Sequence, residues 1–165
     1  YIGKDGQPHE YAAKAGEYLL WVHCAFTESF LQAHLICKYP LQHGADNYVK
    51  QWSASAIGLG LNKAPQSVKE LEDEIARFMR EELSYSKKTR EVVEFILNPP
   101  FGFFAMFFFR PLAKTAVRSL SSAERSLLRL KNPNKVWELI ARFNLWGLQK
   151  ALGSHSPAQE AALAR

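Results

Sequence analysis

The chain has little cysteine, no long apolar run and no alternating pattern of apolar and polar residues. Its two cysteines, Cys24 and Cys37, lie thirteen positions apart in one predicted helix, about 20 Å along its axis, and cannot pair with each other. Unpaired thiols favour an intracellular setting, cytoplasmic or peripheral on a membrane. No apolar run approaches the roughly 20 residues that span a bilayer, and no period-2 segment predicts a strand.

Motifs that specify a metal ion, a nucleophile or a phosphate group are also missing. There is no HExxH, CxxC or GxSxG, and the five histidines are spaced too irregularly to predict metal ligands. The stretch IGLGLNKAP, residues 57–65, resembles a glycine-rich loop, but a helix end followed by a turn explains it. The net charge of +5 is scattered among acidic residues, and no nucleic-acid motif accompanies it. We therefore do not expect nucleic acid as a partner.

What the sequence does contain is helical periodicity over the length of one domain. Two capping boxes, Ser67-x-x-Glu70 and Ser121-x-x-Glu124, mark helix starts, and Asn132-Pro133 predicts an N-cap followed by the first helical position. The sequence thus predicts a single all-α domain of about six to seven helices. An extended lead-in (1–12) is expected before the first helix, and a frayed tail (154–165) after the last. The predicted helices lie at about 13–38, 45–61, 67–84, 88–97, within 101–120, after 121 and at 134–152.

The most aromatic stretch is FGFFAMFFF, residues 101–109. Three interpretations fit it: a buried core helix, which we favour, the wall of a large apolar ligand site, or a surface that contacts a membrane. Arg110 and Lys114, just after it, suit either lipid headgroups or solvent.

The helix that contains YLLWVHCAFTESFLQAHL, residues 18–35, carries an ionisable imidazole on its apolar side. At about 100° per residue, His23, Thr27, Phe30 and His34 share one face. His23 is either a core histidine whose ring has a hydrogen-bond partner, or a wall residue of a pocket. We expect His34 to be polar surface at the rim of this face.

The same stretch resembles a known oxygenase family. The family pattern is close to Y-x-A-x5-L-x-W-V-H-x4-[DE]-S-F-L, which residues 11–31 match from Tyr11 to Leu31. Downstream, Gly58-Leu59, Pro65 and Pro99-Pro100 follow in the family's order, and residues 120–125 correspond to its L-P-x-x-[VI]-R element. In that element Ser121 replaces the usual proline and Glu124 the usual apolar residue. The family is that of the rubber oxygenase (latex-clearing protein) catalytic domain and of the fungal ER-bound oxygenase of mycophenolic acid biosynthesis.

The resemblance implies a haem b cofactor and a pocket beside it. In the family the iron-binding histidine and an upstream Arg and Thr precede W-V-H, and nothing in residues 1–22 matches them. Residues 1–165 are therefore expected to be the C-terminal part of the domain, lacking the N-terminal helices and any metal ligand. His23 then lies beside the cofactor pocket, and Trp21 packs next to it. The pocket or its surroundings are expected to include His23, Trp21, Thr27, Phe30 and Arg125, with no catalytic residue assigned.

Two functions of different classes follow from the resemblance. The first is haem-dependent oxidative cleavage of a carbon–carbon double bond in an isoprenoid or other apolar small molecule, with peripheral contact to a membrane. The alternative is a non-catalytic helical module that binds a lipid, a membrane surface or a protein partner, which the unmatched iron-ligand region favours. The sequence predicts neither the substrate nor the oligomeric state.

Overall fold

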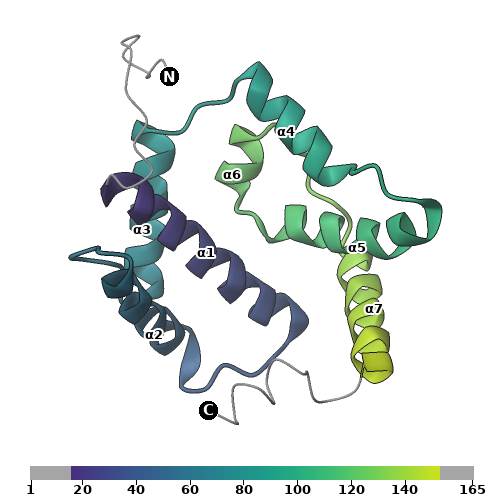
Figure 1. The fold of residues 1–165 in the computed structure, drawn as a ribbon, viewed down its shortest axis with the longest axis horizontal. Helices are drawn as coiled ribbons and strands as arrows, with labels where there is room; N and C mark the ends of the chain where they lie inside the picture. Colours follow the sequence, from purple (N-terminus) through teal and green to yellow (C-terminus); the bar gives the residue numbers. More distant parts are fainter. Residues whose placement is uncertain (1–15, 153–165) are drawn as a thin grey trace.

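In the computed structural model of the protein, which describes residues 16–152, the chain folds into seven helices without a strand (Figure 1). The all-α prediction is confirmed for this range. The predicted lead-in at 1–12 and the tail at 154–165 lie outside the described residues. The helices are α1 (Gly16–Cys37), α2 (Gly44–Gly58), α3 (Val68–Glu81), α4 (Lys87–Leu97), α5 (Phe103–Ser119), α6 (Ser122–Leu127) and α7 (Val136–Leu152).

Helix α1 is central to the arrangement. It packs against α2 and α3 on one side and contacts α5 and α7 on the other (Figure 1). The main core cluster of the described chain lies between α1, α2 and α3. Its buried members are Cys24, Leu31, Val49, Leu71 and Ile75.

The connection between α2 and α3 follows the sequence signals. Gly60 adopts a φ of 82°, and the N–H of Leu61 bonds back to the carbonyl of Ala56 at 2.9 Å, which ends α2 as the glycines predicted. At α3, the Ser67 hydroxyl accepts from the N–H of Glu70 at 3.2 Å, while the Glu70 carboxylate accepts from the N–H of Gln66 at 2.9 Å. The first turn of α3 is therefore capped by its own side chains.

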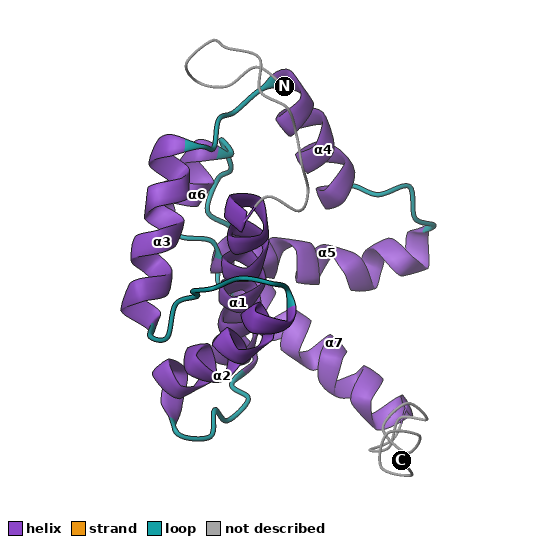
Figure 2. Cartoon of the chain, turned by 60° about the vertical axis from the view of Figure 1, so that its left-hand side comes forward, coloured by secondary structure: helices purple, strands orange, loops and turns teal. Residues whose placement is uncertain are grey.

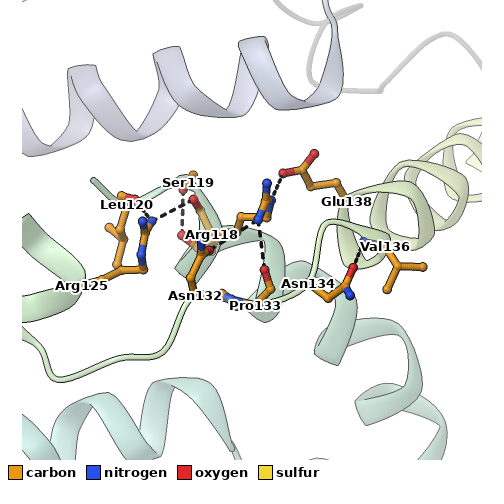
Figure 3. Close-up of polar contacts among 10 residues, drawn as sticks. Arg118, Ser119, Leu120, Arg125, Asn132, Pro133, Asn134, Val136 and Glu138 are labelled. Atoms are coloured by element: carbon orange, nitrogen blue, oxygen red, sulfur yellow. Dashed lines mark hydrogen bonds and ion pairs between the residues drawn. The ribbon is translucent and has the colours of Figure 1, made fainter. Parts of the chain in front are cut away.

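The predicted start of the last helix is wrong. Asn132 and Pro133 precede α7 and do not cap it, because Arg118 at the end of α5 binds both of them (Figure 3). The guanidinium donates to the carbonyl of Pro133 at 3.1 Å, to the side-chain oxygen of Asn132 at 3.5 Å and to Glu138. The cap is made instead by Asn134, whose side-chain oxygen accepts from the N–H of Val136 at 2.9 Å.

The preferred interpretation of residues 101–109 as a buried core helix is also wrong. Phe103 and Phe104 are 81% and 82% exposed, whereas the residues that α5 buries are the smaller Pro111, Ala113 and Val117. Small side chains let α5 approach its neighbours α1 and α7 closely, and the large rings of its first half are left outside that contact. Within residues 16–152, no helix combines the length and apolar character needed to cross a bilayer.

We predict that Leu71→Ala lowers the free energy of unfolding by about 2–5 kcal/mol, because it removes a side chain that is 1% exposed from the cluster joining three helices. Urea titration followed by circular dichroism measures this loss. Leu139→Ala is the matched control, because Leu139 is 62% exposed and its truncation should change stability by less than about 0.5 kcal/mol. Equal losses in the two variants contradict a core centred on Leu71.

Candidate functional site

His23 and Thr27 are neighbours on α1, and the His23 ring lies beside α2. Both are buried, and the Thr27 hydroxyl donates to the backbone carbonyl of His23 at 2.8 Å. The centre of the His23 ring lies 6.5 Å from that of Trp52 on α2. Burial lowers the pKa of His23 below its ordinary value, so the imidazole is neutral at pH 7.

Phe30 and His34 continue this contact toward the end of α1. Phe30 is half exposed and stacks on Trp52, with ring centres 5.3 Å apart. His34, expected at the rim of this face, is half-buried. Its ring packs 5.1 Å from that of Tyr48, and its Nδ1 atom is buried without a hydrogen-bond partner among the described residues.

Trp21 and Arg125 lie apart from this group. Trp21 contacts Phe78 of α3 edge-on, with ring centres 5.3 Å apart, and so it does not pack next to His23 as expected. Arg125 on α6 donates to the backbone carbonyls of Leu120 and, at 3.2 Å, of Arg118 (Figure 3). Its contacts therefore cap the end of α5. The structure brings His23, Thr27 and Phe30 together and separates the other two predicted site residues from them.

A cavity of about 250 Å³ lies between α1, α3 and the segment that joins α5 to α6. Most of its lining is apolar, and two carboxyl groups, those of Glu28 on α1 and Glu124 on α6, face it together. A mostly apolar pocket with a few convergent polar groups is the common form of a small-molecule site. The apolar lining includes Trp21, Ala25, Met79, Leu83, Leu120, Leu127 and Leu128.

Its surroundings favour the protonated form of Glu28. Burial is the largest cause, and together with the charge of Glu124, a side-chain hydrogen bond with Glu124 and the charge of Glu72 it raises the pKa of Glu28 to about 7. The carboxylate of Glu124 also accepts from the N–H of Ser121 at 2.7 Å. Near neutral pH Glu28 is therefore divided between its protonated and ionised forms at the wall of the cavity, as a proton donor or acceptor requires.

Neither carboxyl was expected at the site. Glu28 lies off the face that carries His23, and Glu124 was noted only as a departure from the family element. They are ninety-six positions apart, so spacing along the chain cannot pair them. The sequence offered one signal for each residue: Glu28 lies in the family stretch around W-V-H, and Glu124 lies in the Ser121 capping box.

The described residues do not fit a haem iron site. The resemblance implies a histidine ligand for the haem iron, and no described histidine lines this cavity or the hollows beside α7 and α3. No group of three or more metal-binding side chains occurs in residues 16–152. The chemistry available in the described part of the cavity is therefore apolar binding and proton transfer.

A family model described as "ER-bound oxygenase mpaB/B'/Rubber oxygenase, catalytic domain" matches residues 2–151. The match includes α1 with its W-V-H stretch and both carboxyl groups of the cavity. No curated protein and no solved structure matches the chain.

We predict that Glu28→Gln stabilises the fold at pH 8 and changes it little at pH 5. The pKa of Glu28 is about 7 in the fold and about 4.5 in the unfolded chain. The contribution of the protonated Glu28 side chain to the free energy of unfolding is therefore fully present below pH 4.5 and is lost as the pH rises through 7. Glutamine keeps the neutral form at every pH. With allowance for solvent screening, the gain at pH 8 should be on the order of 1–2 kcal/mol in urea titrations.

Glu91→Gln on α4 is the control. Glu91 is exposed, 3.9 Å from Lys87, and its replacement should have the same small effect at pH 5 and pH 8. A Glu28→Gln variant that is destabilised equally at both pH values rules out a raised pKa at Glu28.

Proposed function

The chain belongs to the family of the ER-bound oxygenase mpaB/B' and rubber oxygenase catalytic domains, and on that premise we propose that it acts in an oxygenase, where it binds an isoprenoid or similarly apolar substrate that the enzyme cleaves. The observation that supports this most directly is the apolar cavity of α1, α3 and α6, which lies inside the matched range and carries the Glu28–Glu124 pair. A substrate without polar groups requires such a lining.

The residues of the cavity supply binding and a proton. The rings and aliphatic chains of Trp21, Met79 and Leu83 replace water around an apolar chain, at about 25 cal/mol per Å² of apolar surface removed from water. Glu28 can give or take a proton at neutral pH at the edge of that apolar volume. At about 250 Å³, the cavity holds a short segment of a long substrate, and the remainder must extend out of it.

The haem b that the resemblance implies would supply activation of dioxygen. Because no described histidine fits its iron, we expect the iron ligand to lie outside residues 16–152, and we assign the described residues to binding and proton transfer alone. The alternative function, a non-catalytic helical module, uses the same cavity to bind an apolar molecule without turnover.

We predict that Leu83→Trp fills the cavity and lowers the turnover of squalene, a short isoprenoid used as a probe, at least tenfold. The full chain is titrated with haem until its Soret absorption saturates; oxygen uptake and carbonyl products trapped as hydrazones are then measured. Ile57→Trp is the control, because Ile57 is 77% exposed on α2 and lines none of the cavities described above.

Equal rates in Leu83→Trp and Ile57→Trp contradict this cavity as the substrate site. If the parent protein binds haem to saturation and squalene quenches its tryptophan fluorescence, but neither oxygen uptake nor carbonyl product is detected, the non-catalytic module is the correct function.

A further inference from the structure

The first half of α5 exposes a set of aromatic rings, which we call the aromatic face: Phe103, Phe104, Phe107 and Phe108. Each ring is more than half exposed, and together they present on the order of 600 Å² of apolar surface. That equals the largest patches found on ordinary monomers, which are often functional. The aromatic face is therefore too large to be explained as single apolar side chains scattered over a surface.

The rings of this face rest mainly on each other. The centres of Phe103 and Phe104 are 5.7 Å apart, and those of Phe107 and Phe108 are 5.6 Å apart, both edge to face. This half of α5 projects away from α1, α2 and α3 (Figure 2). The side chains that anchor the helix, Ala113 and Val117, belong to its other half.

The segment that carries the aromatic face has charges of one sign only. Residues 95–123 contain no Asp or Glu. Arg110 and Lys114 are exposed and form no ion pair within the described chain, in contrast to Arg118, which binds Glu138. At about 100° per residue, Arg110 and Lys114 lie on the same side of the helix as Phe103 and Phe107.

We propose that the aromatic face docks on an anionic lipid bilayer. Phenylalanine rings enter the boundary between headgroups and acyl chains, and long basic side chains beside them reach the lipid phosphates. The inference rests on the exposed rings together with unpaired positive charge, and it does not depend on the oxygenase function.

A second copy of the chain suits this face less well. A two-fold interface brings the same patch of both copies together, so Arg110 and Lys114 of one copy would meet those of the other without an acid between them. An anionic membrane neutralises these charges.

We predict that the full chain floats with phosphatidylcholine vesicles containing phosphatidylserine, and that Phe103→Ser/Phe104→Ser reduces the bound fraction at least tenfold. Both rings are more than 80% exposed, so circular dichroism and thermal unfolding should be unchanged. Ile57→Ser, at a 77% exposed position of α2, should bind as the parent does.

The charge is tested by Arg110→Ala and Lys114→Ala. Each should weaken binding to the anionic vesicles roughly fivefold and leave the weak binding to pure phosphatidylcholine unchanged. The proposal is overturned if the double phenylalanine variant floats as well as the parent, or if the parent floats with neither vesicle. It is also overturned if sedimentation of lipid-free protein shows a dimer that this variant dissociates, because the face then belongs to a second copy.

Discussion

The packing of α1 against α2 and α3 through Leu31, Val49 and Leu71 is the interaction on which the rest of the described structure depends. One straight helix presents different sides to different neighbours, so fixing one side fixes the others. With Cys24 and Leu31 held in the core against α2 and α3, Glu28 faces the cavity that Glu124 also lines. The candidate site is thus a consequence of how the core orients α1, and the core and the site cannot be altered independently.

The sequence predicted the helices well because their signals are local. Apolar periodicity and the Ser67 cap are read within one or two turns. The errors come from distant contacts. Asn132 has the chemistry of an N-cap, but Arg118, fourteen positions earlier, takes its side-chain oxygen. The exposure of Phe103 depends on which half of α5 fits closely against its neighbours, and hydrophobicity alone does not decide that.

The carboxyl pair shows how one local motif can serve a second purpose. Glu124 caps its own helix by accepting from the N–H of Ser121, and the same carboxylate raises the pKa of Glu28 across the cavity. The raised pKa of Glu28 at the cavity wall therefore depends in part on a residue of the α6 cap. This pairing could not be predicted, because it joins residues ninety-six positions apart.

The two cysteines of α1 differ in how readily their thiols react. Cys24 is fully buried, and burial together with the charge of Glu74 raises its pKa to about 12, which suppresses the thiolate that alkylating reagents attack. Cys37, at the other end of the helix, is partly accessible beside α7. Reagent reaches Cys24 only when α1 separates from α2 and α3. Its modification thus records the opening of the core, while Cys37 records the reagent's access to the folded surface.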